Sequence, residues 1–218
     1  MQATPRRTGR PDAQSIELIN RKIMDTATQL FIEQGYAATS VDQIASVAGA
    51  GKQTIYRRYA SKEELFGAVI LELVRSVLEN PLKMRANAAD PLQALRDFSR
   101  SLLDLAFVKP ETMSLYRILV SEALRFPDLV ALVTKSVLQP IDDMLIHLLE
   151  AARKKGQVRA DVPIEDQCHI LGGMCTGWVF QQTLFGNRSL SNETERDAFF
   201  ESIWTVFVKG AVDGVARQ

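Results

Sequence analysis

The sequence is poor in cysteine, glycine and proline, and each shortage excludes a class of protein. Its 218 residues include two cysteines, Cys168 and Cys175, which cannot build a disulfide framework. Twelve glycines and eight prolines are too few for an all-β protein rich in loops. Apolar residues make up 46% of the chain and charged residues 24%, which argues against a disordered chain and indicates one or two packed domains.

Long apolar runs are also missing. Residues 1–15 are basic but no apolar stretch follows them, so we expect no secretory signal and a cytoplasmic protein with reduced thiols. Residues 167–187 contain no Asp, Glu, Lys or Arg and would be long enough to span a bilayer. His169, Gly172 and Gln181 interrupt the segment, which predicts a helix buried between protein surfaces and no membrane partner.

Apolar residues recur at three- and four-residue steps through almost the whole chain, which is the period of amphipathic helices. Gly35 predicts the end of the first helix, and Ser61 with Glu64 forms a capping box that begins another. Pro140 lies inside a helix predicted over 127–156 and is expected to kink or break it. No long stretch alternates with period two, so the predicted fold is all-α, with about nine helices.

Residues 39–59 carry the clearest functional pattern. Ile44, Ala48 and Ile55 are spaced to fill the small core between two crossed helices. Gly49 suits the turn between them, because positive φ is costly for other residues. The pattern predicts a helix-turn-helix, and its second helix would project Lys52, Gln53, Arg57 and Arg58 outward. Lysine and glutamine near the start of such a helix can reach base edges in a major groove.

The charge is unevenly distributed, although 26 basic and 26 acidic side chains give a net charge of zero. Residues 1–60 carry eight basic and five acidic groups, and the remainder carries 18 and 21. A basic amino-terminal region suits an anionic partner. On spacing and charge alone, duplex DNA is one candidate partner. The alternatives are a helical binding module whose basic head recognises RNA or an acidic protein, and an ordinary helical corner with a polar surface.

The sequence contains no matched catalytic constellation. Residues 49–53 superficially resemble a phosphate-binding loop, but Ser46 stands where the first glycine belongs, Gln53 replaces the Ser or Thr, and a helix precedes the loop. His147 and His169 are the two histidines, too few for a convincing histidine metal site. We therefore expect no enzyme, no metal and no cofactor.

A set of residues spread over about 60 positions matches a known pattern at fixed spacing. It comprises Ala27, Leu30-Phe31, Gly35-Tyr36, Thr39-Ser40-Val41, Ile44-Ala45, Ala48-Gly49, Lys52, Thr54-Ile55-Tyr56 and Ser61-Lys62-Glu63-Glu64-Leu65. On these matches, residues 16–78 resemble the DNA-binding domain of the TetR family of transcriptional regulators. The chain departs from the family at Ala50, where a larger aliphatic residue is usual, and at Gly51, where Ser or Thr usually caps the recognition helix.

The resemblance implies a homodimer that binds a palindromic operator in double-stranded DNA, with half-sites roughly 34 to 36 Å apart. The implied domains are a basic arm over 1–15, a helix-turn-helix domain over 16–60, and a helical ligand-binding and dimerisation domain over 61–218. The expected function is a repressor released by an unknown small-molecule effector that is largely apolar. By carry-over, the base contacts are Lys52, Gln53 and Arg57, and the DNA backbone contacts are Thr39, Ser40, Thr54, Tyr56, Arg58 and Lys62.

Two further sets of residues are predicted in the larger domain. The resemblance implies a ligand pocket lined by Phe107, Met113, Tyr116, Arg117, Leu119, Val120, Met144, His147, Met174 and Trp178, unless most of these are core side chains. Two apolar stripes, over 164–185 and 200–215, have the spacing of a coiled-coil seam. They predict a dimer interface of Cys168, Leu171, Cys175, Phe200, Ile203, Trp204, Phe207 and Ala211, the monomer's own core being the alternative.

Overall fold

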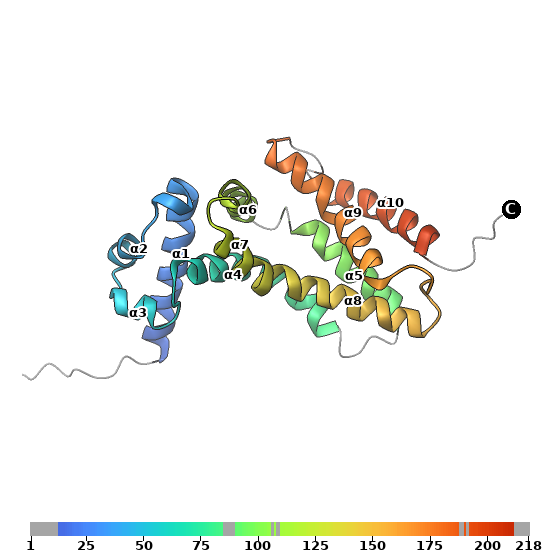
Figure 1. Ribbon diagram of the computed structural model, residues 1–218, viewed down its shortest axis with the longest axis horizontal. Helices are drawn as coiled ribbons and strands as arrows, with labels where there is room; N and C mark the ends of the chain where they lie inside the picture. Colours follow the sequence, from blue (N-terminus) through green and yellow to red (C-terminus); the bar gives the residue numbers. More distant parts are fainter. Residues whose placement is uncertain are drawn as a thin grey trace, which may run out of the picture. The chain divides into compact units, whose positions relative to one another are not determined.

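Helices account for every regular element in the computed structural model, which describes residues 13–84, 90–105, 107, 110–187, 190 and 192–211. No strand occurs among these residues, and the predicted all-α class is confirmed. Three of the labelled elements, α7, the π-helical η1 and α8, follow one another without interruption. The described part of the chain therefore forms nine continuous helical runs (Figure 1).

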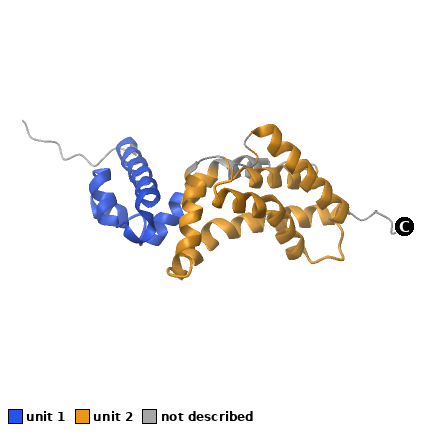
Figure 2. Cartoon of the chain, turned by 90° about the horizontal axis from the view of Figure 1, so that it is seen from above, with its two compact units in different colours: residues 1–69 blue, residues 70–218 orange. Residues whose placement is uncertain are grey.

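The chain divides into two units, residues 1–69 and 70–218 (Figure 2). The division falls within α4, Lys62–Met84, rather than before it at the expected boundary after residue 60. Phe66 explains the difference, because its ring packs against Phe31 and Tyr36 in unit 1. Residues 1–12 of the expected basic arm lie outside the described residues, and residues 13–15 already belong to α1.

Unit 1 consists of α1 (Ala13–Ala38), α2 (Val41–Ala48), α3 (Lys52–Tyr56) and the start of α4. Gly35, expected to end the first helix, instead lies at a kink within α1, with φ of 82° and ψ of 168°. The predicted capping box is present at the start of α4, where the Glu64 N–H donates to Ser61 Oγ at 3.2 Å. The Glu64 carboxylate accepts from the Ala60 N–H at 2.7 Å, one residue before the N–H that a capping box uses.

Three aromatic rings form the centre of unit 1. The Phe66 ring lies edge-on to Phe31 and Tyr36, with centroids 4.9 and 5.3 Å apart, and Phe31 stacks on Tyr36. All three side chains are fully buried. The first turns of α4 are thereby fixed to α1, which makes them part of the unit that contains the helix-turn-helix.

Unit 2 contains the rest of α4 and the remaining helices. These are α5 (Pro91–Asp104), α6 (Pro110–Glu122), α7 (Pro127–Val133), η1 (Thr134–Leu138), α8 (Gln139–Lys154), α9 (Ile164–Leu184) and α10 (Glu193–Ala211). Helices α5, α8 and α9 pack against one another, and α10 covers α5 and α9 (Figure 1). Their shared core is apolar and includes Phe98, Leu149, Leu171 and Phe200.

Pro140 does not break its helix. Helical residues run from Pro127 to Lys154, with the π-helical turn η1 directly before the proline. A proline inside a helix lacks an N–H and clashes with the carbonyl four residues earlier, here that of Ser136, which lies within η1. The Gln139 N–H donates to Thr134 O, a five-residue step wider than an α-helical turn. The π-helical turn thus accommodates the proline. Of the expected kink or break, the break does not occur.

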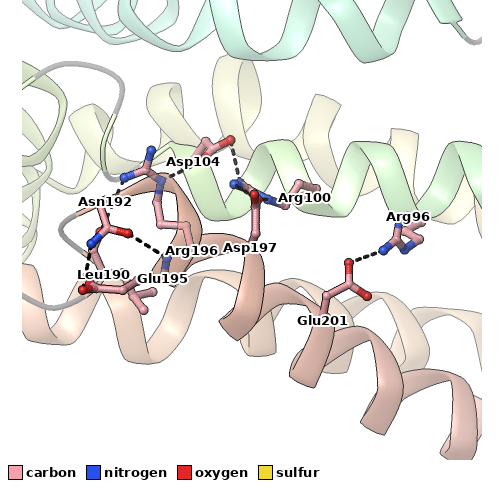
Figure 3. A network of polar contacts seen from close by, with 9 residues as sticks. All are labelled: Arg96, Arg100, Asp104, Leu190, Asn192, Glu195, Arg196, Asp197 and Glu201. Atoms are coloured by element: carbon pink, nitrogen blue, oxygen red, sulfur yellow. Dashed lines mark hydrogen bonds and ion pairs between the residues drawn. The ribbon is translucent and has the colours of Figure 1, made fainter.

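Ion pairs hold α10 against α5 (Figure 3). Arg100 of α5 contacts Asp104 at 2.6 Å and Asp197 of α10 at 2.7 Å. Arg196 of α10 lies 3.2 Å from Asp104, and Arg96 pairs with Glu201. Asp104 therefore bridges two arginines, one from each helix. Asp197 and Glu201 of α10 pair with Arg100 and Arg96 of α5.

The uncharged segment considered as a membrane span forms most of α9. Its buried residues, such as Leu171 and Val179, face the core that α9 shares with α5 and α8. Within the described ranges, none of the helices combines the length and apolar character needed to cross a bilayer.

Candidate nucleic-acid interface

The turn between α2 and α3 has the geometry expected from the sequence. The Ser40 side chain caps α2 by accepting from the Gln43 N–H at 3.1 Å. Gly49 ends α2 in the left-handed region, with φ of 66°, and the next amide, of Ala50, donates to Ala45 O at 2.9 Å. Ile44 and Ile55 are buried on either side of the turn. Local hydrogen bonds and one small apolar contact therefore orient α3.

Polar and basic side chains surround α3. Lys52, Gln53 and Tyr56 on the helix, and Arg57 and Arg58 directly after it, are all exposed. Thr54 is half-buried, and Ser40 at the start of α2 is exposed while its hydroxyl serves as the helix cap. The structure thus brings the predicted base-reading residues together on one short helix and the turn that follows it. Their contacts with DNA stay predictions.

Lys52 is already engaged by an acidic residue. Its Nζ lies 2.6 Å from Asp42 Oδ1 and 2.9 Å from Asp42 Oδ2, and 5.8 Å from the centroid of the Tyr56 ring. The hydrogen bond to Asp42 raises the pKa of Lys52 above its usual value. Sequence reasoning missed Asp42, although it is the one acidic residue within 39–59.

The Thr39 side chain is buried within unit 1. It is 1% exposed, and its hydroxyl lies 3.1 Å from Leu30 O and 2.8 Å from Gly35 O, to which it donates. The hydroxyl therefore satisfies carbonyls at the kink of α1 and faces no open surface. The predicted phosphate contact of Thr39 stays a prediction, and it would have to be made without the buried hydroxyl.

Lys62 also has partners within unit 1. Its Nζ donates to Tyr36 O at 2.9 Å and to Thr39 O at 3.0 Å, and lies 4.1 Å from the centroid of the Tyr36 ring. A cation is favourable beside the carbonyls that end a helix, so Lys62 fixes the start of α4 to the end of α1. Its predicted phosphate contact stays a prediction, and would have to coexist with these bonds.

The neighbouring residue Glu63 makes unit 1 sensitive to acid. The Tyr36 hydroxyl donates to Glu63 Oε1 at 2.6 Å, and this bond lowers the pKa of Glu63 below its reference value of 4.5. The folded state thus favours the ionised carboxyl. Its contribution to stability is complete above the unfolded pKa and is lost as the pH falls through the folded pKa.

We expect Tyr36→Phe to reduce the loss of stability between pH 7 and pH 3, because the variant cannot favour the ionised form of Glu63 in this way. Urea unfolding at several pH values measures the effect. Tyr59→Phe is the matched control, since the Tyr59 hydroxyl donates to Met24 Sδ, 3.3 Å away, and not to a carboxylate. Equal acid sensitivity in wild type and Tyr36→Phe would refute this role for the bond.

Comparison with known families covers both units. Residues 23–69 match the family described as "Bacterial regulatory proteins, tetR family", which includes the helix-turn-helix. Residues 93–210, more than half of the chain, match "AefR-like transcriptional repressor, C-terminal domain". The chain belongs to the TetR family. Members of this family are DNA-binding transcriptional regulators, so the resemblance seen in the sequence is confirmed.

Individual TetR-family proteins are similar over most of their length. The HTH-type transcriptional repressor NicS of Pseudomonas putida is 29% identical over 75% of this chain and 76% of its own. The structure of the Flavonoid-responsive Regulator FrrA has a TM-score of 0.69 and 29% identity, covering 90% of this chain and 98% of its own. A TetR-family regulator from Mesorhizobium loti, with a TM-score of 0.70 and 23% identity over 90% of this chain and 98% of its own, shares the fold.

The residues predicted to line a ligand pocket in unit 2 differ in how far their side chains are exposed. Met113, Leu119 and Met144 are buried, and Phe107, Tyr116 and Met174 are half-buried. Val120, His147 and Trp178 are exposed. These positions neither confirm nor contradict the pocket, so the ligand contacts of the whole set stay predictions.

Helices α6 and α9 meet at one part of this set. The Tyr116 ring lies edge-on to Phe180, with centroids 4.9 Å apart. Arg117, expected as a polar anchor for ligand, donates to Thr183 O at 3.3 Å, near the end of α9. Sequence reasoning missed Thr112 in the same helix, a buried hydroxyl without a hydrogen-bond partner among the described residues.

The predicted dimer interface is also corrected. Within a single chain, six of its residues are at most 5% exposed: Cys168, Leu171, Cys175, Phe200, Ile203 and Phe207. Trp204 is half-buried against Phe200 and Phe207, and the side chain of Ala211 lies outside the described residues. Burial raises the pKa of the Cys175 thiol to about 12, as expected for a core residue. The six buried residues belong to the core of unit 2, because a seam pattern identifies an apolar face but not its partner.

Exposed apolar residues occur along the same two helices, and Trp178 and Phe185 follow Leu171 at seven-residue steps, within the stripe itself. On α9, Ile170 is 53% and Trp178 45% exposed, and Phe185 directly after the helix is 71% exposed. Val206 of α10 is 62% exposed, and the Trp178 ring contacts Phe199 of α10, with centroids 5.2 Å apart. We call these five residues the α9–α10 apolar face.

Proposed function

We propose that this TetR-family protein is a cytoplasmic repressor that binds a palindromic operator as a homodimer and leaves it when a small, largely apolar effector binds unit 2. The observation that carries the proposal is the set of exposed polar and basic side chains on and after α3. Lys52 and Gln53 lie at the start of a recognition helix, where side chains reach base edges. The similarity to NicS, named as a repressor, supports repression rather than activation.

The α9–α10 apolar face supports the homodimer. Exposed apolar residues that gather on two adjacent helices mark an interaction surface. The exposed Gly173 and Gly177 lie on α9 between Ile170 and Trp178, where small residues permit a close helix approach. A two-fold copy of this face would pair four helices, α9 and α10 from each subunit, through the same surface on both.

Contacts of α6 support an aromatic effector. The Tyr116–Phe180 ring pair offers a surface for stacking. The Thr112 hydroxyl, which has no hydrogen-bond partner among the described residues, offers one polar contact four residues before Tyr116. FrrA is named as flavonoid-responsive, which is consistent with a planar aromatic effector carrying hydroxyl groups here. Such an effector releases DNA only in so far as it binds the released state more tightly than the operator-bound state.

Selection of binding sites from randomised duplex DNA, at two salt concentrations, tests the proposed function. We expect a palindromic motif with half-sites about one helical turn apart. Arg58→Ala should weaken binding to every duplex and reduce the salt slope by about 1 per subunit, whereas Gln53→Ala should change the preferred base. Weak binding that vanishes with salt and enriches no motif would contradict the proposal, because it would be counterion release alone.

A further inference from the structure

Asp42 occupies an unexpected position for an acidic residue. The helix-turn-helix over 39–59 contains Lys52, Arg57 and Arg58 and is proposed to bind DNA, which is a polyanion. Asp42 nevertheless lies in the first turn of α2. A carboxylate there is favourable to α2, whose N-terminus carries partial positive charge. That benefit does not require a contact with α3, so the ion pair with Lys52 needs a separate explanation.

The Asp42–Lys52 pair lies on the protein surface and not in the core. Nearly two-thirds of the Asp42 side chain and about half of the Lys52 side chain are exposed. The pair also joins α2 and α3, the two helices of the helix-turn-helix, with one residue from each. Its partners for any further hydrogen bond must therefore come from solvent or from a molecule bound to this surface.

The chemistry of the pair differs from that of a free lysine. An ammonium has three N–H donors and no acceptor, and a carboxylate has about four acceptor positions. With Nζ 2.6 and 2.9 Å from the two Asp42 oxygens, the pair retains at least one donor and several acceptors side by side. Its formal charge is zero. A phosphate approaching Lys52 therefore meets a carboxylate, which opposes a purely electrostatic contact.

A base pair presents a complementary pattern. In the major groove, adenine offers its N7 acceptor beside its N6 donor, and a G·C pair offers the guanine O6 acceptor beside the cytosine N4 donor. A neutral pair with adjacent donor and acceptor matches either edge. A phosphate has acceptors alone, so it can use the donor of the pair but not its carboxylate.

We propose that Asp42 is a specificity-determining residue, which changes Lys52 from a phosphate-binding cation into one half of a neutral donor–acceptor pair that reads a base-pair edge in each half-site. The proposal rests on the proposed operator binding. The Tyr56 ring supports the proposal. Its centroid lies 5.8 Å from Nζ, and the attraction between ring and ammonium keeps the ammonium close to α3.

The test compares Asp42→Asn with wild type on two duplexes, the selected operator and an unrelated duplex of equal length, over a range of salt concentrations. Asparagine retains the shape of the side chain but frees the charge of Lys52. We expect the affinity for the unrelated duplex to rise and the salt slope to steepen by about 0.9 per subunit, hence about 2 per dimer. Discrimination at one base pair of each half-site should fall by roughly 10-fold or more.

Two further variants separate this effect from a change in net charge. Asp25→Asn removes an exposed acidic charge from α1 in the same unit, and should leave the salt slope and the selected motif unchanged. In a Lys52→Met background, Asp42→Asn should no longer steepen the slope, because the freed cation is absent. Thermal unfolding of each variant checks that unit 1 remains folded.

The outcomes are distinct. If wild type discriminates between the duplexes while Asp42→Asn behaves as Asp25→Asn does, the inference is overturned and the proposed function stands. Equal weakening on both duplexes with an unchanged slope would also overturn it, since Asp42 would then only support α2. If wild type discriminates between no duplexes, the proposed function fails and this inference fails with it.

Discussion

Trp178→Glu is expected to convert the protein from a dimer to a monomer and to abolish tight operator binding. Trp178 belongs to the α9–α10 apolar face, on which α9 and α10 meet through its contact with Phe199. A two-fold interface would bring two such glutamates into an apolar environment without partners. Burying an unpaired charge costs several kcal/mol, so we expect the dimer dissociation constant to rise by about 10³-fold or more.

Analytical ultracentrifugation measures the dissociation constant, and a titration with the selected operator measures its consequence for DNA binding. Leu124→Glu is the matched control, because Leu124 is fully exposed in the turn after α6 and undergoes the same kind of change. It should stay dimeric and bind the operator as wild type does. If Trp178→Glu remained dimeric over the same protein concentrations as the wild type, the α9–α10 apolar face would not be the interface.

The second large effect is expected from Phe66→Ala. The Phe66 side chain is fully buried between Phe31 and Tyr36, and it fixes α4 to α1. Removing a buried phenylalanine ring costs about 3–5 kcal/mol through lost burial and the cavity left behind. We expect unit 1 to unfold first and DNA binding to be lost, because the orientation of α3 depends on this small core.

Two optical signals can follow the units separately. Both tryptophans, Trp178 and Trp204, lie in unit 2, so their fluorescence reports unfolding there, whereas far-ultraviolet circular dichroism reports helix in both units. During urea unfolding of Phe66→Ala, the circular dichroism should begin to change before the fluorescence. Phe66→Leu, which retains most of the volume, should cost less than about 1.5 kcal/mol. A single transition at the wild-type midpoint in Phe66→Ala would refute the expectation.

The helix-turn-helix could be recognised from the sequence because its determinants are local. Gly49 takes the positive φ of the turn, and Ile44 and Ile55 fill the core at the spacing that the pattern requires. The Ser40 and Ser61 caps act within three residues. Interactions over such short separations follow from residue type and periodicity alone, so the all-α fold and the helix-turn-helix were predictable.

Contacts between distant segments were not predictable in the same way. Thr39 resembles a phosphate contact in the sequence, but the kink at Gly35 brings two carbonyls within reach of its hydroxyl. Lys62 resembles another, but Tyr36 O and Thr39 O lie beside its ammonium. These internal bonds depend on where α1 ends in space, which the residues near Thr39 and Lys62 do not specify.

The sequence by itself determined the all-α class, the position of the turn between α2 and α3, and the set of polar side chains on α3, because periodicity and capping are properties of neighbouring residues. The tertiary structure alone decided which apolar residues of α9 and α10 are core, with Cys175 and Phe207 buried and Trp178 and Val206 exposed. An amphipathic pattern states that a face is buried but not against which partner. That choice belongs to the packing of α5 and α8 against α9, which brings together residues far apart in the chain.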